Sequence, residues 1–262
     1  MSFSIVIPTK TRSNLLACVA CIRDAHETAR IIVVDDFADR DEARWLREEG
    51  PENLRTCTWI DGVKPFVFAR NINLGIAAAG DDDVILLNDD ALLKTPLGFS
   101  WLSGEAGERP EYGVLAAAVD GACGCTEQLA QAGTRVRIVQ HHTVVFISVY
   151  LRREVLDRLA HHSVGQHGQW LDERYVDYGY DDDDACERIR QLHLKLGVFD
   201  GCVVEHGCLP SSYRTAHVVN GVAVATGADL QPNRQRFLEK WGFVPGQGPS
   251  MRPVAVTPAV HW

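Results

Sequence analysis

The stretch VILLNDD, residues 84–90, is a short apolar run that ends in three polar residues. Two earlier stretches have the same form, FSIVIPT at residues 3–9 and RIIVVDD at residues 30–36. Short apolar runs rich in β-branched residues are typical of strands that are buried on both faces. A further strand is expected over residues 54–60. The first half of the chain therefore contains the pattern of a buried sheet.

Helical patterns fill the gaps between these runs. Apolar residues recur at helical spacing over residues 15–22, a charged helix is expected over 39–49, and a third helix over 66–79 stops at Gly80. Strands that alternate with helices favour a parallel sheet with right-handed crossovers. The predicted fold class is α/β, with a mostly parallel central sheet and helices on both of its faces.

The polar residues that end these strands are expected to share one edge of the sheet. They are Thr9, the pair Asp35 and Asp36, and the triplet at 88–90. In open parallel sheets, ligands bind beyond the carboxyl ends of the strands. The sequence thus predicts an acidic cleft, which suits a hard divalent cation such as Mg²⁺ or Mn²⁺. A solvated acidic turn is the alternative for the triplet.

The second half of the chain is less regular. Residues 136–151 are mostly β-branched and apolar, and a short helix is expected over 153–160. A longer helix over 181–196 and a last strand over 198–204 follow. From residue 207 onward the chain is rich in Pro, Gly and Asn, which predicts a tail that packs over the domain or stays mobile.

Four consecutive carboxylates, Asp181–Asp184, begin the predicted helix at 181–196. On a helical projection Asp182 shares the buried face, whereas Asp183 and Asp184 face outward and Asp184 is placed to pair with Arg188. Neighbouring carboxylates raise the pKa of an inward carboxyl group, and such a group suits a general base. The alternative is a solvated set of acids at a helix N-terminus.

Composition bounds the possible partners. The net charge of −9 gives no long-range attraction to a polyanion, so composition does not support a nucleic-acid partner. No run of about 18 apolar residues suggests a membrane span, and the N-terminus reads as a strand rather than a signal peptide. The expected location is cytoplasmic, with peripheral attachment to a membrane as the alternative.

The order of these pieces resembles the family 2 glycosyltransferases and their GT-A relatives. The resemblance covers residues 3–214 and implies metal-assisted transfer of a sugar from a nucleotide-diphosphate sugar to a hydroxyl group, with inversion. Two departures are Asp181, where glutamate is usual, and Ala185, where leucine is usual. The motifs are SIVIPT at 4–9, VVDD at 33–36, ARNINLG at 69–75, LLNDD at 86–90, LDERY at 171–175, GYDDDDACER at 179–188 and VEH at 204–206.

The resemblance implies roles on the donor side of the site. Asp90 would bind Mn²⁺ or Mg²⁺, and Asp89 would bind the donor ribose. Pro8 and Thr9 would line the nucleotide pocket. Asp36 would accept a hydrogen bond from an N–H of the base, although a turn-forming aspartate is the alternative there.

Three further residues complete the predicted site. Arg70 would pair with the diphosphate or the base, and an exposed helix cap is the alternative. Asp182 would be the general base. His206, at the end of the last predicted strand, would be a further metal or phosphate ligand, with a packing histidine as the alternative.

The predicted domain organisation is a GT-A domain over residues 1–215 and a C-terminal extension over 216–262. Within the domain, residues 1–95 form the nucleotide-sugar half and residues 96–215 the acceptor half. UDP- or GDP-sugars are the expected donors. The acceptor stays open between a saccharide, a lipid-linked sugar, a protein and a modified nucleic acid, and the sequence does not indicate an oligomeric state.

Two rival functions fit the same fold. A sugar nucleotidyltransferase would need a glycine-rich phosphate loop after the first strand, and PTKTR at residues 8–12 has basic residues but no glycine. A catalytically inactive protein that binds a nucleotide sugar or carbohydrate would not need Asp90 and Asp182, which are both present. The glycosyltransferase interpretation is therefore preferred.

Overall fold

The predicted nucleotide-sugar half, residues 1–95, is called the donor half. It forms an alternating arrangement of strands and helices, as its sequence predicts. In the computed structural model the described residues are 2–37, 39–64, 66–162, 168–176, 179–210, 218–219, 222–223, 230–245 and 247. The first four strands are β1 (Phe3–Thr9), β2 (Arg30–Asp35), β3 (Thr58–Asp61) and β4 (Asp83–Leu87). They lie in the order β3-β2-β1-β4 and are all parallel, so their carboxyl ends share one edge.

The acceptor half continues the same sheet. Its strands are β6 (Tyr112–Gly121), β7 (Val136–Ile138), β8 (Ser148–Leu151) and β9 (Lys195–His206), and β5 (Ala91–Leu93), from the end of residues 1–95, joins them in the sheet. Strand β8 lies antiparallel between β4 and β6, whereas β9 is parallel to β6. Strands β5 and β7 both pair antiparallel with β9. Strands β6 and β9 consequently run in the same direction as the first four, and most of the sheet has one orientation.

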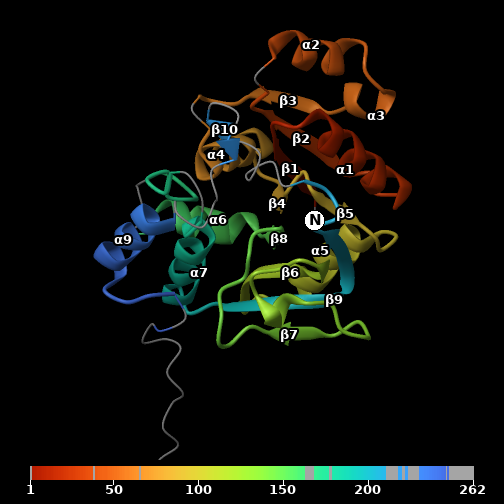
Figure 1. Cartoon of the computed structure of the whole chain (residues 1–262). Coiled ribbons are helices and arrows are strands. Elements are labelled where there is room, and N and C mark those ends of the chain that lie inside the picture. The colour runs from red at the N-terminus through yellow and green to blue at the C-terminus, as the bar shows by residue number, and fades with distance from the viewer. Residues whose placement is uncertain are drawn as a thin grey trace, which may run out of the picture.

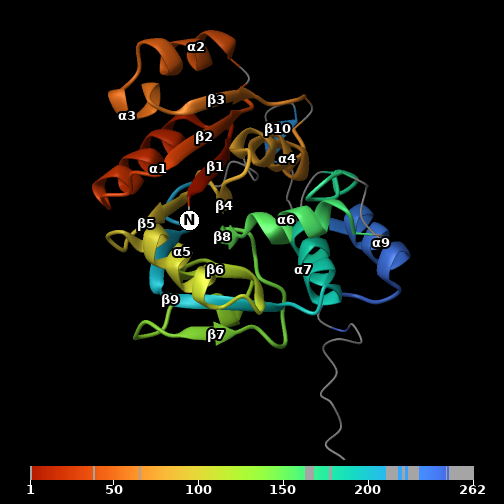
Figure 2. The same ribbon diagram turned by 180° about the vertical axis from the view of Figure 1, so that it is seen from behind.

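Helices cover both faces of this sheet, as Figures 1 and 2 show from opposite sides. One core cluster joins the sheet to α1 (Arg12–Asp24), α2 (Arg40–Glu48), α3 (Glu52–Arg55) and α5 (Gly98–Glu108). The other joins it to α4 (Phe68–Ala79), α6 (Arg153–Ala160) and α7 (Asp181–Gln191). The remaining described elements are the short 3₁₀ helix η1 (Thr126–Gln128), the pair β10 (Val218–Val219) and β11 (Val222–Ala223), and α9 (Leu230–Trp241).

Alternation along the strands supplies both core clusters. In β1, Ile5 and Ile7 belong to the α1 side, while Val6 between them belongs to the α4 side. All three side chains are completely buried. This is why the strand reads as a continuous apolar run, and the α/β prediction with helices on both faces is confirmed.

Several predicted boundaries are wrong. The strand expected over 54–60 is the short helix α3 followed by β3, and the helix expected over 181–196 ends at Gln191, because β9 already begins at Lys195. The sequence pattern gave no element for most of residues 96–135, where α5 and the long strand β6 lie. Helix α9 also occurs within the region expected to be a tail.

The domain boundary at residues 215–216 stays a prediction, because residues 211–217 lie outside the described residues. Most of the extension over 216–262 lies outside them as well. Among the residues that are described, no helix is both long enough and apolar enough to cross a membrane.

Candidate functional site

A cleft of about 990 Å³ opens at the carboxyl edge of the sheet. Its described lining comes from the residues after β4, β6 and β9, from the segment that leads into β8, and from the start of α7. Segments far apart in the sequence meet here because six strands end, and β8 begins, at this edge. The cleft therefore lies where the strand order predicts a ligand site.

Asp90 and His206 face each other in this cleft. Strand β5 begins directly after Asp90, and Ala91 is in register with His206 of β9, which places the two side chains together. His206 Nε2 lies 3.5 Å from Asp90 Oδ1. Asp90 is 2% exposed, and its Oδ1 accepts no hydrogen bond from the residues that the structure describes. A buried carboxylate oxygen without a donor is costly unless a cation or another charged group satisfies it.

The orientation of the His206 ring suits a metal ligand. Its Nδ1 lies within hydrogen-bonding distance of the Ala122 carbonyl oxygen, which can only accept, so Nδ1 carries a proton. In the neutral ring Nε2 then presents its lone pair toward Asp90. Metal-bound histidines commonly donate their second ring N–H to a carbonyl in this way. The described residues hold no cluster of three or more His, Cys, Asp or Glu side chains suited to a metal.

Asp89 lies below the cleft and joins two strands. It is buried, and its Oδ2 accepts a hydrogen bond of 2.7 Å from the Thr9 hydroxyl group. This contact links the end of β1 to the end of β4. The structure therefore brings Thr9 and Asp89 together, at the strand edge where both were predicted, with Pro8 preceding them in β1.

The two carboxylates that end β2 both have cationic partners. Asp35 accepts from the Phe37 N–H and lies 2.6 Å from an Arg47 guanidinium nitrogen. Asp36 is buried, and its Oδ1 lies 2.7 Å from Lys64 Nζ. A ligand that forms a hydrogen bond with the Asp36 carboxylate would therefore also lie close to the ammonium group of Lys64.

Lys10 is a candidate for the donor side of the site that the sequence analysis did not select. Burial lowers the pKa of this lysine, while the nearby carboxylates of Asp36 and Asp89 act in the opposite direction. Its Nζ also lies 4.0 Å from the centre of the Phe66 ring. The signal was present in the sequence, because Lys10 directly follows Thr9 at the predicted functional edge.

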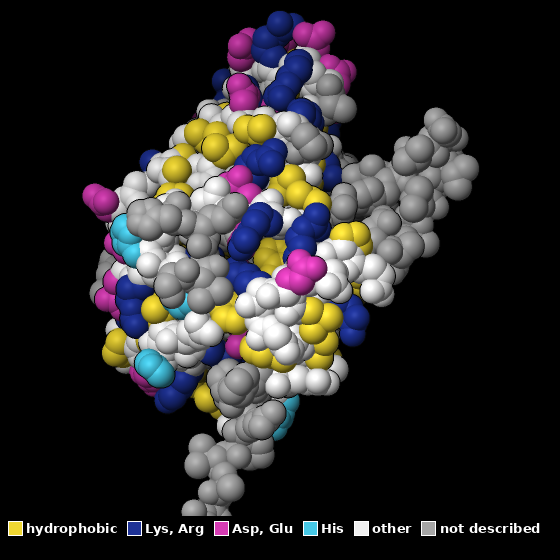
Figure 3. Space-filling view, turned by 90° about the vertical axis from the view of Figure 1, so that its left-hand side faces the viewer, with side chains coloured by type: hydrophobic (Ala, Val, Ile, Leu, Met, Phe, Trp, Pro, Cys, Tyr) yellow, Lys and Arg dark blue, Asp and Glu magenta, His cyan; other side chains and the backbone are white. Residues whose placement is uncertain are grey.

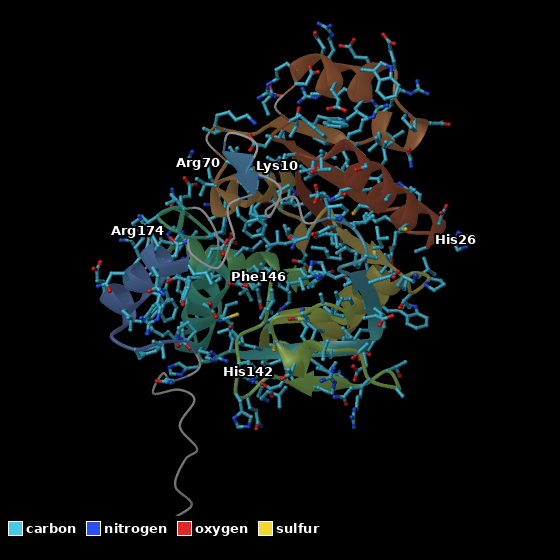
Figure 4. All side chains as sticks on the ribbon, in the orientation of Figure 1. Lys10, His26, Arg70, His142, Phe146 and Arg174 are labelled. Atoms are coloured by element: carbon cyan, nitrogen blue, oxygen red, sulfur yellow. The ribbon has the colours of Figure 1, made fainter. Side chains whose placement is uncertain are left out.

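Arg70 forms an ion pair with Glu173. Its Nε lies 3.4 Å from Glu173 Oε2, so α4 is linked to the loop before α7. Glu173 Oε1 also accepts a hydrogen bond of 3.0 Å from Asn73, one turn further along α4. Figure 4 shows Arg70 and Lys10 on the α4 side of the molecule. The Arg70 side chain is partly exposed, and its pairing with a donor stays a prediction.

The first three carboxylates of α7 line the cleft opposite the sheet edge. Asp182 accepts a hydrogen bond of 2.9 Å from the Asp183 N–H, and the Phe146 N–H also points to its carboxylate. Burial, and then the charges of Asp183 and Asp181, raise the pKa of Asp182 well above its usual value. Burial raises the pKa of Asp181 as well, to about 6. Asp182 is half-buried and lines the cleft together with Asp183, so its burial does not single it out, and its role as a base stays a prediction.

The predicted exposure of the next two carboxylates is wrong. Asp183 is half-buried in the cleft and accepts a hydrogen bond from the Thr143 hydroxyl group. Asp184 is completely buried, and Lys240 Nζ lies 2.7 Å from its Oδ1. Trp241 Nε1 donates to the same oxygen at 2.8 Å.

The helical projection predicted Arg188 as the partner of Asp184, but residues of helix α9 pair with Asp184 instead. The Arg188 side chain instead donates to backbone carbonyl groups, including that of Trp170 at 2.8 Å. Lys240 lies 56 positions from Asp184 in the sequence, and no local pattern connects them.

Comparisons with known proteins bear on the fold of the chain. The model of glycosyl transferase family 2 matches residues 4–96 of the 262, which nearly coincides with the predicted nucleotide-sugar half. None of the curated proteins matches the chain. Because the family match covers the donor half, the remainder of the chain is compared through structure.

Three solved structures share the fold. GalNAc-T7 with UDP, GalNAc and Mn²⁺ has a TM-score of 0.59 at 12% identity, over 92% of this chain and 54% of that one. TarS from S. aureus has a TM-score of 0.58 at 12% identity, over 93% and 44%. The mannosyltransferase PcManGT from Pyrobaculum calidifontis, in complex with GDP-Man and Mn²⁺, has a TM-score of 0.56 at 14% identity, over 82% and 59%.

These similarities establish the fold class. The chain has a GT-A-like fold that resembles family 2 glycosyltransferases, as its motifs predicted. It spans about half the length of the solved structures it matches.

Proposed function

We propose that this chain is a metal-dependent glycosyltransferase that moves a sugar from a nucleotide-diphosphate sugar to an acceptor hydroxyl group, with inversion. The observation that carries the proposal is the pairing of Asp90 and His206 in one cleft with the carboxylates of α7. The first pair suits a cation and the second group suits a base. The family match over the donor half and the shared fold support the same reaction class.

Asp90 Oδ1 and His206 Nε2 would hold Mn²⁺ or Mg²⁺. The fit rests on the buried Asp90 oxygen that accepts no hydrogen bond and on the His206 ring orientation set by the Ala122 carbonyl. Such a cation requires only one or two protein ligands when diphosphate oxygens supply others. When bound, it would neutralise the charge that develops on the departing nucleoside diphosphate.

The donor would lie along the ends of β1, β2 and β4. Asp36 would accept a hydrogen bond from the base, with Lys64 able to donate to a neighbouring carbonyl of the same base. Asp89 would bind the ribose beside Pro8 and Thr9. UDP- and GDP-sugars are the proposed donors, since two of the similar structures contain UDP or GDP-Man.

Cationic side chains on the α4 side would meet the donor phosphates. The charges of Asp36 and Asp89 both act to raise the pKa of Lys10, so this lysine would be near the proposed base and ribose positions. Arg70 would reach the diphosphate only by leaving Glu173. The face at the left of Figure 1, viewed directly in Figure 3, has Lys and Arg side chains gathered around a hollow in its middle.

Asp182 would act as the general base. The acceptor oxygen would attack the anomeric carbon, the bond from that carbon to the phosphate oxygen would break, and the acceptor proton would move to Asp182. A raised pKa helps this step, because a base is most effective when its pKa approaches the working pH. Attack from the side opposite the leaving group inverts the anomeric configuration.

A donor screen tests the proposed function. UDP-, GDP-, dTDP- and CDP-sugars are incubated with the protein and Mn²⁺, and release of nucleoside diphosphate is measured. The proposal expects slow, Mn²⁺-dependent release from one class of donor, and loss of that release in Asp182→Asn. Nucleotide binding without release from any donor would indicate an inactive binding protein. Pyrophosphate release from a nucleoside triphosphate and a sugar phosphate would indicate a nucleotidyltransferase.

A further inference from the structure

Tyr180 has a backbone conformation that its side chain disfavours. Its φ angle is +74°, in the left-handed region, and Gly179 before it has a φ angle of +82°. Glycine adopts this region readily, whereas a bulky residue does so at a cost of about 1–3 kcal/mol. Such strain persists only where the surroundings enforce it, and it is concentrated at functional sites.

Helix α9 and its surroundings hold this turn in place. The Tyr180 ring centre lies 5.8 Å from that of Phe237, a completely buried residue of α9. Asn233, also on α9, donates a hydrogen bond of 2.9 Å to the Gly179 carbonyl oxygen. The half-buried Tyr180 side chain lines the cleft next to Asp181, the first residue of α7. The fold therefore holds the Tyr180 ring in the cleft that also contains the proposed base, Asp182.

The charge of the cleft restricts what can approach this ring. The described lining includes four carboxylates, Asp90 and Asp181–Asp183, and none of its described members is a lysine or arginine. Lys10 and Lys64 lie instead by Asp36 on the donor side. The donor side thus has lysines near it, whereas carboxylates predominate in the described lining at the α7 side, where burial raises the pKa of Tyr180 and Arg234 is near enough for its charge to lower it.

Other aromatic residues also line the cleft. Phe68, Phe146 and Tyr175 line it together with Tyr180. The C–H groups on one face of a pyranose ring are apolar and pack against aromatic faces, while the hydroxyl groups at the rim of the sugar remain available for hydrogen bonds. A sugar stacked on Tyr180 would present a hydroxyl group toward the α7 carboxylates.

We propose that Tyr180 is an acceptor-binding residue and that the acceptor is an uncharged saccharide whose ring stacks on its side chain. This inference rests on the proposed function and assigns its acceptor class. It disfavours acceptors that carry a phosphate next to the reacting hydroxyl group, which include nucleic acids and phosphorylated sugars. The strained backbone is maintained because it places the ring at the start of the helix that carries Asp182.

The test uses the full chain with Mn²⁺ and either UDP or GDP, whichever binds. Three probes are titrated by ligand-observed NMR: methyl β-glucoside, glucosamine and glucose 6-phosphate. The variants are Tyr180→Phe, which keeps the ring, and Tyr180→Asn, which tolerates the left-handed conformation without a ring. His26→Gly is the matched control, because His26 has a φ angle of +63° and lies on the opposite side of the molecule from α7 and α9 (Figure 4).

The proposal expects methyl β-glucoside to bind more tightly than glucose 6-phosphate. Its affinity should be retained in Tyr180→Phe and His26→Gly, and should fall roughly 2–10-fold in Tyr180→Asn, the range for loss of an aromatic contact. Thermal unfolding of each variant confirms that it is folded. Absence of methyl β-glucoside binding, tighter binding of glucose 6-phosphate, or equal affinity in a folded Tyr180→Asn overturns the proposal.

The proposed function is tested separately in the same samples. Mn²⁺-dependent nucleotide binding by the wild-type chain would support it even if the sugar probes failed. If nucleotide does not bind, the proposed function fails, and the acceptor assignment, which rests on it, fails with it.

Discussion

The carboxylates of the donor half and those of the acceptor half are held in different ways. Asp35 and Asp36 at the end of β2 each have a cation within 2.7 Å, and Asp89 accepts from Thr9. The carboxylates of residues 181–183 instead crowd together at the start of α7, and their pKa values are raised. Asp35, Asp36 and Asp89 thus have charged or hydroxyl partners, whereas the carboxylates at the start of α7 lie close to one another.

Asp184 shows how the acceptor half maintains this crowding. It follows three carboxylates directly, yet it is buried against Lys240 and Trp241 of α9. Lys240 also lies 2.8 Å from Asp172, so one ammonium group joins two buried carboxylates. The helix that carries the proposed base is therefore anchored by a segment well outside the family match.

The largest expected effect is on turnover, from removal of the proposed base. Asp182→Asn keeps the size of the side chain but cannot accept a proton, so transfer or donor hydrolysis should fall roughly 10²–10⁴-fold. Asp157→Asn, an exposed carboxylate on α6, is the control and should keep the wild-type rate. Rates are measured at saturating donor. An unchanged rate in Asp182→Asn would remove the catalytic distinction between the two halves.

The next effect concerns the anchor of α7. Lys240→Met leaves Asp172 and Asp184 buried without their shared cation, which should lower the free energy of unfolding by about 3–5 kcal/mol. Arg44→Met is the comparison, since Arg44 is 66% exposed and pairs with an exposed Asp41. That change should cost at most about 1 kcal/mol. Denaturant unfolding of both variants measures the two losses in free energy of unfolding. Equal losses would show that the Lys240 contacts stabilise the fold no more than an exposed ion pair does.

A smaller effect is expected on nucleotide affinity in the donor half. Asp36→Ala should weaken binding by roughly 1–3 kcal/mol, because a polar group of the base and Lys64 both lose a partner. Discrimination between UDP and GDP should decrease as well. Asp61→Ala, at the exposed end of β3, serves as the strand-end control. If calorimetry shows that Asp36→Ala keeps the wild-type preference between UDP and GDP, Asp36 is a turn-forming residue and does not contact the nucleotide base.

The smallest effect is a difference in the pH dependence of stability. Asp182 has a raised pKa when folded, so its protonated form stabilises the fold at low pH. That contribution is complete below the pKa of the unfolded chain and is lost as the pH rises through the higher folded value. Asp182→Asn cannot ionise, so its unfolding free energy should decline less over this interval. Parallel pH profiles for the two proteins would contradict the raised pKa.

Much of the donor half could be predicted from sequence. Buried parallel strands read as continuous apolar runs, and polar residues such as Thr9 and Asp36 mark where they end. Because strand ends share an edge, the clustering of Asp89 and Asp90 near these residues followed without any structure.

The acceptor half was less predictable, because its contacts are long-range. A helical projection could not assign Asp184 correctly, since its burial depends on Lys240, 56 positions away. The antiparallel insertion of β8 between β4 and β6 has no local sequence signature either. Asp90 and His206 were each proposed as ligands by resemblance, but only the register of β5 with β9 places them 3.5 Å apart.

The central claim is that Asp90 and His206 hold a cation that binds the donor. Calorimetric titration of UDP and GDP into the protein, with Mn²⁺ and with EDTA, tests it most directly. The wild-type chain should bind one nucleotide clearly more tightly in Mn²⁺, and Asp90→Ala should lose that difference while its thermal unfolding remains cooperative. Equal affinity of the wild-type chain in Mn²⁺ and in EDTA would contradict the account.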